Sequence, residues 1–273
     1  MTTYGAGTIT TNNHQQKENT IMHLEQTITQ LGSMRLATMA AMLQQRLANG
    51  DHRQLSHEEF VSLLVEDEYM ARKNRKLARM IGQANFKPEQ ACMENIHYDP
   101  RRGFEKKDIM QFTLRSWIDN AQNVIITGPT GTGKTYIAEA IGLHVCKMGL
   151  PVRKIRYKRL FEEILSARGT GMYLNYIQKL QKTKVLILDD FAMQPINHSE
   201  LSDLLDIIEE RDQLGPVIIT TQYPPSKWHA LFDDPTAADA ICDRLITTAA
   251  KLNLKGKSLR GGQKKTKEKS CAK

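Results

Sequence analysis

The sequence lacks any long apolar segment and any paired cysteine motif. Its apolar runs are short, as in residues 185–188, and none approaches the roughly 20 residues of a membrane-spanning helix. The first residues show no basic region followed by an apolar stretch, so a secretory signal is not expected. The 4 cysteines lie far apart without a CxxC pair, which argues against a zinc cluster and against a disulfide framework. These absences favour a cytoplasmic protein that does not use a membrane.

Acidic residues are scarce only at the C-terminal end. The net charge is +8, and residues 251–273 contain nine Lys or Arg and one Glu, whereas the rest of the chain contains 29 basic and 29 acidic side chains. The body is therefore neutral, and the tail carries the whole excess. Such a tail attracts phosphate backbones with an affinity that falls as salt rises. A solvated tail that only aids solubility is the alternative.

The first third of the sequence predicts a flexible leader and a small all-helical domain. Residues 1–20 are polar and are typical of a leader, and residues 21–95 form the helical domain. Within it, Ser56 and Glu59 have the spacing of a capping box at the start of a helix. The basic stretch 72–79 follows on that helix. It either contacts nucleic acid or a partner protein, or it is an ordinary solvated face.

Residues 96–256 alternate short apolar strands with helical patterns, which predicts an α/β domain with a parallel sheet flanked by helices. A helix is expected over 108–119, before the first strand. The basic tail is assigned to residues 257–273. The expected strands are 123–127, 151–156, 184–189, 217–221 and 251–254.

Residues 128–135, with the sequence GPTGTGKT, fit the phosphate-binding pattern G-x-x-x-x-G-K-[ST]. Glycines let backbone N–H groups turn toward an anion, and the helix that follows adds its positive end. Lys134 is expected to reach the β and γ phosphates of ATP, and the Thr135 hydroxyl is expected to ligate Mg²⁺. An expected strand precedes the loop and a helix follows it, which is the context that the motif requires. The expected nucleotide ligands are Gly128, Pro129, Thr130, Gly131, Thr132, Gly133, Lys134 and Thr135.

Two carboxylates, Asp189 and Asp190, end the apolar strand expected over 184–189. Ligands of open α/β sheets bind at this end of the strands. Asp189 is expected to hold the Mg²⁺ shell, and Asp190 to orient or deprotonate the water that attacks the nucleotide. A pair of acids that only caps the next helix is the alternative.

Three further polar residues are candidates for contact with the nucleotide. Gln222 follows the strand 217–221, where its amide reaches the γ-phosphate or the lytic water, unless it is only a turn residue before Pro224. Arg244 is a candidate to stabilise charge on the nucleotide of a second subunit, although a lone arginine in a helix is more often a surface residue. Arg211 is a weaker candidate of the same kind.

Four segments in this order resemble the IstB-type ATP-binding proteins of bacterial insertion sequences, which are similar to DnaC-type helicase loaders and DnaA initiators. The resemblance covers about residues 30–260, including MRLATMA at 34–40. The segments are GPTGTGKT (128–135), LILDDF (186–191), IITTQYPPSKWH (218–229) and DRLITTAAKLNLKGKSLR (243–260).

The resemblance implies an AAA+ ATPase core with a small helical N-terminal domain. It implies ATP-dependent assembly of a homo-oligomer on double-stranded DNA, and stimulation of a separate IstA-type transposase. Lys134 and Thr135 match the nucleotide loop, and Asp189 and Asp190 the acidic motif. Gln222 matches the sensor at the strand end, and Arg244 the arginine finger of a neighbouring subunit.

Two departures qualify the match, and three other functions are consistent with the motifs. Many AAA+ enzymes have Glu where this chain has Asp190, and the chain is too short after the last strand for a helical lid, so Arg260 is not assigned to one. A DnaC-type helicase loader would act on single strands and a helicase. A small-molecule kinase would need a lid and a second pocket. A non-hydrolysing ATP-gated scaffold would not need both Asp189 and Asp190.

Overall fold

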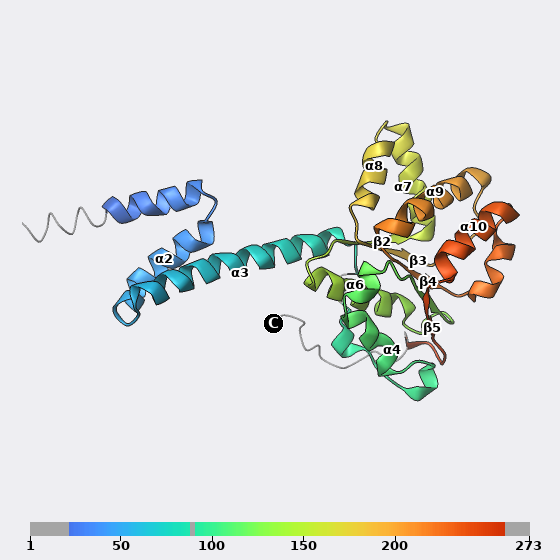
Figure 1. The fold of residues 1–273 in the computed structure, drawn as a ribbon, viewed down its shortest axis with the longest axis horizontal. Helices are drawn as coiled ribbons and strands as arrows, with labels where there is room; N and C mark the ends of the chain where they lie inside the picture. Colours follow the sequence, from blue (N-terminus) through green and yellow to red (C-terminus); the bar gives the residue numbers. More distant parts are fainter. Residues whose placement is uncertain (1–21, 88–90, 260–273) are drawn as a thin grey trace, which may run out of the picture. The chain divides into compact units, whose positions relative to one another are not determined.

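The computed structural model describes residues 22–87 and 91–259, which divide into two compact units between Lys76 and Leu77 (Figure 1). The first unit is helical, as the apolar spacing predicts. It contains a helix over 22–33, then α2 (Ala37–Asn49), then most of α3 (His57–Gln83). Helix α2 ends at Gly50, whose φ of 79° lies in the left-handed region that glycine adopts without strain.

The predicted capping box at the start of α3 is confirmed. The Glu59 backbone N–H donates to Ser56 Oγ at 3.2 Å, and the Ser56 backbone N–H donates to Glu59 Oε2 at 2.8 Å. These two bonds satisfy amide groups that have no partner inside the helix. Helix α3 continues from this cap through the whole basic stretch 72–79, as the sequence predicts.

A buried carboxylate uses part of that basic stretch. Glu68 accepts a hydrogen bond from the Met39 backbone N–H at 2.9 Å and ion pairs from Arg72 at 2.8 Å and Arg75 at 3.2 Å. Two of the basic side chains of residues 72–79 therefore stabilise the first unit internally, because a buried carboxylate needs such partners. Lys73, Lys76 and Arg79 are exposed.

The second unit is built on a 5-stranded sheet in the order β2-β3-β4-β1-β5. All its strand pairs are parallel, so the strands end at one common edge. The predicted parallel α/β fold is confirmed, with strand bounds within one residue of expectation. The strands are β1 (Val124–Thr127), β2 (Val152–Arg156), β3 (Val185–Asp189), β4 (Val217–Thr221) and β5 (Ala250–Asn253).

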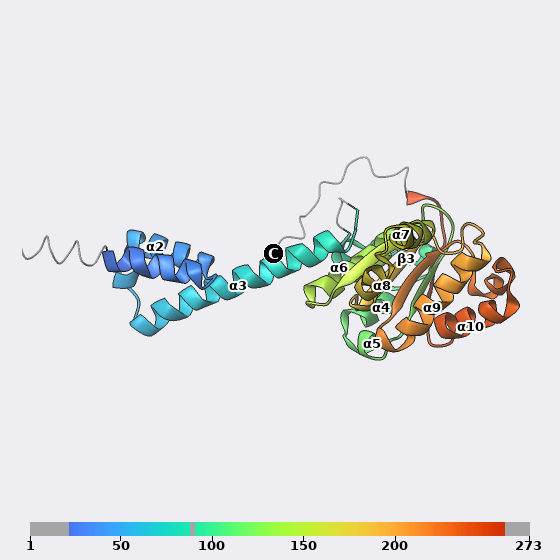
Figure 2. The ribbon, with the colours of Figure 1, turned by 90° about the horizontal axis from the view of Figure 1, so that it is seen from above.

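Both faces of the sheet are covered by helices (Figures 1 and 2). Successive strand residues point to opposite faces, so Ile126 and Ile187 pack with α6 and the segment before β1, whereas Ile125 and Leu188 pack with α7, α9 and α10. The three inner strands, β3, β4 and β1, are buried on both sides, which explains why their sequences begin with continuous apolar runs. The helices are α6 (Lys134–Lys147), α7 (Tyr157–Gly169), α8 (Tyr173–Gln181), α9 (His198–Leu214) and α10 (Pro235–Ile246).

The prediction of one helix over 108–119 is wrong. The structure has α4 (Lys106–Met110), a 3₁₀ turn η4 (Gln111–Thr113) and α5 (Ser116–Asp119), separated by an extended Leu114 with ψ of 152°. The break lets Trp117 donate through Nε1 to the Phe112 carbonyl at 3.2 Å and pack edge-to-face on its ring. Tertiary packing therefore overrides the helical spacing here. The other 3₁₀ turns are η1 (Asp51–Arg53), η2 (Met93–Asn95), η3 (Pro100–Arg102), η5 (Pro225–Lys227) and η6 (His229–Leu231).

The described residues also bear on the membrane and cysteine features of the sequence. Within residues 22–87 and 91–259, no helix is long and apolar enough to cross a membrane. The cysteines Cys146 and Cys242 are free thiols, and burial raises the pKa of Cys146 to about 12.

Candidate nucleotide site

The loop at 128–135 connects β1 to α6 and has the backbone shape of an anion cradle. Gly128, Gly131 and Gly133 have φ values of 145°, 83° and 93°, which residues with a side chain rarely adopt. A Cβ at Gly128 would also lie 2.4 Å from the Leu254 carbonyl oxygen, and one at Gly131 would lie 2.1 Å from Ser258 Oγ. Backbone angle and packing both require glycine, and the loop leads into the N-terminus of α6, where unpaired N–H groups attract anions.

The segment after β5 and the turn before α4 hold this loop from outside. The Leu259 backbone N–H donates to the Gly131 carbonyl at 2.8 Å, and Arg102 donates through Nη2 to the Thr132 carbonyl at 2.8 Å. The Arg102 guanidinium also lies 4.9 Å from the centre of the Phe104 ring, and burial lowers its pKa. The loop conformation therefore depends on residues about 30 positions before it and 130 positions after it.

Lys134 is 7% exposed and lies inside the curve of the loop. Its Nζ donates to the carbonyls of Gly128 at 2.8 Å and Pro129 at 3.0 Å. The ammonium group is thus held at the centre of the cradle, where phosphate oxygens of a bound anion would compete with these carbonyls.

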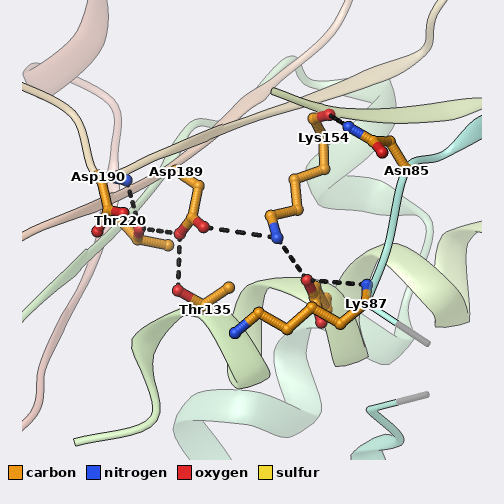
Figure 3. A network of polar contacts seen from close by, with 8 residues as sticks. Asn85, Lys87, Thr135, Lys154, Asp189, Asp190 and Thr220 are labelled. Atoms are coloured by element: carbon orange, nitrogen blue, oxygen red, sulfur yellow. Dashed lines mark hydrogen bonds and ion pairs between the residues drawn. The ribbon is translucent and has the colours of Figure 1, made fainter. Parts of the chain in front are cut away.

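Thr135, Asp189 and Thr220 meet at the carboxyl edge of the sheet (Figure 3). Thr135 Oγ1 donates to Asp189 Oδ1 at 2.7 Å, and Thr220 Oγ1 donates to the same oxygen at 2.6 Å. Asp189 is only 2% exposed, and Thr220 is fully buried. The structure therefore brings the two expected metal ligands, which are 54 residues apart, into direct contact.

Asp190 is adjacent in sequence but has a different environment. It is exposed and has a φ of 57°, so the chain turns sharply after β3. Its backbone N–H donates to Thr220 Oγ1 at 3.1 Å, and the next N–H, of Phe191, donates to the Thr220 carbonyl at 2.8 Å. The end of β4 thus fixes a left-handed turn at Asp190, whose side chain is exposed.

Gln222 is exposed directly after β4, the neighbour of β3. The loop that follows is anchored by Trp228, which is fully buried, lies 4.7 Å from the Phe191 ring and donates through Nε1 to the Tyr223 carbonyl at 3.2 Å. Gln222 and Asp190 therefore leave neighbouring strand ends at the same edge, and one aromatic contact links the turns that carry them.

Arg244 lies at the other edge of the sheet. Its carbonyl accepts a hydrogen bond from Asn123 Nδ2 at 2.9 Å, and Asn123 precedes β1, whereas the loop follows β1. Its guanidinium pairs with Glu209 of α9 at 2.9 Å. The structure does not bring Arg244 to the nucleotide loop of its own chain.

Arg211 also lies at that opposite edge, but it is buried. It is 2% exposed and donates to backbone carbonyls that precede β3 and β4, including those of Lys184 at 3.0 Å and Gly215 at 3.3 Å. Burial lowers its pKa to about 10, which still leaves it charged at neutral pH. Arg211, the weaker candidate, thus links the segments that lead into β3 and β4.

The sequence did not identify Thr220, Lys154 or Glu139 as site residues. Lys154 Nζ lies 3.5 Å from Asp189 Oδ2 and donates to Glu139 Oε1 at 2.6 Å, and both side chains are buried. The sequence of β2, VRKIR, contains three basic residues and does not show that Lys154, unlike Arg153 and Arg156, is buried.

The donor set is suited to Mg²⁺. Thr135 Oγ1 and Asp189 Oδ1 are hard oxygen ligands, and Mg²⁺ in proteins commonly takes one or two such groups together with waters and substrate phosphates. In the part of the chain that the structure describes, no group of three or more His, Cys, Asp or Glu forms a metal cage. A Mg²⁺ ion held by Thr135 and Asp189 would take its remaining ligands from water and substrate phosphates.

Comparison with known proteins agrees with this geometry. Residues 29–270 match the family model described as IstB-like ATP binding protein. A Sinorhizobium fredii protein named as an insertion-sequence ATP-binding protein is 38% identical over 88% of this chain and 97% of its own length. A Mycobacterium tuberculosis protein, named as an ATP-binding protein in an insertion sequence, is 32% identical over 84% of this chain and 92% of its own length.

Solved structures share the fold of the second unit. The initiator DnaA bound to AMPPCP and single-stranded DNA superposes with a TM-score of 0.54 at 15% identity, over 63% of this chain and 52% of that chain. The DnaC helicase loader superposes with a TM-score of 0.50 at 18% identity, over 61% of this chain and 98% of that chain. The resemblance inferred from the motifs is confirmed: the chain belongs to the IstB-like ATP-binding protein family, and it is a P-loop AAA+ ATPase.

Proposed function

We propose that ATP binds on the loop 128–135, and that Thr135 and Asp189 hold its Mg²⁺. The observation that carries this proposal is the 2.7 Å contact between Thr135 Oγ1 and Asp189 Oδ1, at the strand edge beside the glycine cradle. Lys134 exchanges the carbonyls of Gly128 and Pro129 for phosphate oxygens. Bound Mg²⁺ would neutralise charge that develops on the transferred phosphoryl group.

Asp190 and Gln222 act on the attacking water in this proposal. Asp190 is the exposed acid of the pair, so its carboxylate orients the water or accepts its proton. Gln222 leaves the neighbouring strand end and supplies an amide to the same water or to the γ-phosphate. Asp189 is unsuited to this role, because its Oδ1 already accepts two hydrogen bonds.

The ATPase, we further propose, assembles on duplex DNA and stimulates the transposase of its insertion sequence. The family relationship and the insertion-sequence names of the relatives support this role. Arg244 would contact the nucleotide of the next subunit, which is consistent with its position away from its own loop. Exposed Lys73, Lys76 and Arg79 offer basic surface for DNA, and the predicted contacts in the tail beyond residue 259 lie outside the described residues.

A DNA-dependent ATPase measurement tests the proposal. Hydrolysis by purified protein is measured alone, with duplex DNA and with single strands, and Lys134→Ala provides the blank. Stimulation by duplex DNA, followed by co-sedimentation of the transposase with the DNA-bound protein, supports the transposition role. Stimulation by single strands alone supports a helicase loader, the second candidate, whose fold similarity to DnaC is its support. Hydrolysis that ignores both DNA forms contradicts both roles.

A further inference from the structure

Two further buried charged groups, Lys154 and Glu139, lie close to Asp189. Lys154 is on the side of Asp189 that is away from Thr220 (Figure 3). Lys154 comes from β2, next to β3, and Glu139 comes from the second turn of α6. Lys154 is 6% exposed, Glu139 3% and Asp189 2%. Three ionisable groups are thus removed from water, in surroundings where each charge needs a partner.

One lysine is shared unequally between two carboxylates. Lys154 Nζ lies 2.6 Å from Glu139 Oε1 but 3.5 Å from Asp189 Oδ2, so Glu139 makes the hydrogen bond and Asp189 makes only the longer ion pair. The other oxygen of Asp189 faces Thr135. Coulomb energy in buried sites changes steeply with distance and dielectric. The position of Lys154 between its two partners therefore affects how strongly Asp189 attracts a cation.

The segment after α3 fastens both members of the Glu139–Lys154 pair. The Lys154 backbone N–H donates to the Ala84 carbonyl at 2.8 Å, and Asn85 Nδ2 donates to the Lys154 carbonyl at 3.2 Å. The Lys87 backbone N–H donates to Glu139 Oε1 at 3.4 Å. Asn85 has a φ of 59°, so the chain turns at this point to make these contacts.

We propose that Glu139 and Lys154 are positioning residues that set the Mg²⁺ affinity of Asp189. Glu139 holds the Lys154 ammonium away from Asp189, and the segment 84–87 keeps Glu139 and the Lys154 backbone in place. When Glu139 no longer accepts from Lys154, the ammonium moves onto Asp189 and competes with the metal. The inference rests on the proposal that Thr135 and Asp189 hold Mg²⁺.

The two single substitutions have opposite expected effects. Glu139→Gln removes the negative charge that holds the Lys154 ammonium, and the Mg²⁺ concentration for half-maximal binding of a fluorescent ATP analogue should rise about tenfold. Lys154→Met removes the competing charge, and this concentration should fall several-fold. The double variant Glu139→Gln with Lys154→Met removes both effects and should lie within about twofold of the wild type. If the ion pair were purely structural, each single substitution would lower the melting temperature, and the two substitutions would not shift the Mg²⁺ concentration in opposite directions.

The experiment titrates Mg²⁺ at a fixed concentration of the analogue and records the melting temperature of each variant. Arg46→Met is the matched control, because it breaks a partly buried ion pair with Asp67 in the first unit and should leave the Mg²⁺ titration unchanged. If Lys154→Met does not fold, Glu139→Gln and the double variant still test the inference. Weaker Mg²⁺ binding by Glu139→Gln, together with wild-type Mg²⁺ binding by the double variant, would support it.

Two results would overturn the inference, and they can be told apart. If analogue binding by the wild type does not depend on Mg²⁺, the proposed metal site is wrong and the inference falls with it. If the wild type depends on Mg²⁺, but Glu139→Gln matches it or the double variant is as weak as that single variant, the metal site stands and the positioning role is wrong.

Discussion

At the carboxyl edge of the sheet, Thr135, Asp189 and Thr220 bond to one another through their side chains, whereas at the opposite edge Arg211 donates to backbone carbonyls. Both edges contain buried charge, from Asp189 at the first and from Arg211 at the second. The Thr135 and Thr220 hydroxyls can rotate away from Asp189 when a ligand binds, whereas loss of the Arg211 contacts would leave buried carbonyls before β3 and β4 without their donor. Under the proposed function, polar residues thus serve ligand binding at one edge and stability at the other.

The largest expected effect concerns Arg244, which lies at the opposite edge with Arg211 but is proposed to act on the nucleotide of another subunit. Arg244→Ala should lower hydrolysis by the DNA-bound assembly about a thousandfold, since an arginine supplied in trans commonly contributes at least that much. Binding of an ATP analogue should be unchanged. The measurement is steady-state hydrolysis with saturating duplex DNA.

A mixing experiment separates action in trans from local damage. Mixing Arg244→Ala with Lys134→Ala should restore part of the activity, because the second variant supplies an arginine to the intact nucleotide loop of the first. Glu209→Gln is the control: it removes the negative charge that pairs with Arg244 at 2.9 Å inside the chain and should leave hydrolysis near the wild-type rate. Failure of the mixture to recover activity would argue against a role in trans.

The exposed acid at the carboxyl edge should give the next largest effect. Asp190→Asn should lower the hydrolysis rate about a hundredfold, the usual contribution of a general base. Binding of the ATP analogue and its Mg²⁺ dependence should be retained, because Asp189 and not Asp190 contacts Thr135. Single-turnover hydrolysis together with analogue binding checks both points. A parallel loss of binding would mean that Asp190 is a metal ligand.

A substitution of Arg211, at the edge opposite the nucleotide loop, is expected to affect stability alone. Arg211→Met should lower the free energy of unfolding by about 3 kcal/mol, because buried carbonyls before β3 and β4 lose their donor. Urea denaturation measures the change. Analogue binding per folded molecule should equal that of the wild type, and a selective loss of nucleotide affinity would show that the two edges are not separate.

Local sequence patterns predicted the parts of the site whose determinants are adjacent in the chain. The glycine spacing of 128–135 and the apolar strands needed only their immediate neighbours, and both appear where expected. Pairing between distant residues left no such pattern. Lys154 meets Glu139 across 15 residues, and Thr220 meets Asp189 across 31.

The same limit explains the helix predicted over 108–119. Its apolar spacing is genuine, but Phe112 and Trp117 pack on each other and in the core beneath the sheet, which requires the break at Leu114. The position of Arg244 relative to the loop likewise depends on strand direction and not on its neighbours. Residue types therefore indicated the chemistry, and the parallel sheet decided which residues share an edge.

Two adjacent buried threonines at the end of β4 give the smallest and most closely matched test. Thr220 Oγ1 contacts Asp189 and the Asp190 backbone, whereas Thr221 Oγ1 donates to the Phe191 carbonyl at 2.9 Å and accepts from the Tyr223 backbone N–H at 3.2 Å. Valine keeps the shape of each side chain and removes two hydrogen bonds. Each substitution should lower the free energy of unfolding by about 1–2 kcal/mol.

Hydrolysis should distinguish these two variants. Thr220→Val frees both Asp189 Oδ1 and the turn at Asp190, so the rate should fall about tenfold while analogue binding changes little, as expected when an acid–base group is misplaced. Thr221→Val leaves Asp189 untouched, and its rate should fall no more than about twofold. Rates and urea midpoints measured side by side provide the comparison. Equal losses of rate in both variants would mean that the strand end acts through general stability and not through the position of the acidic pair.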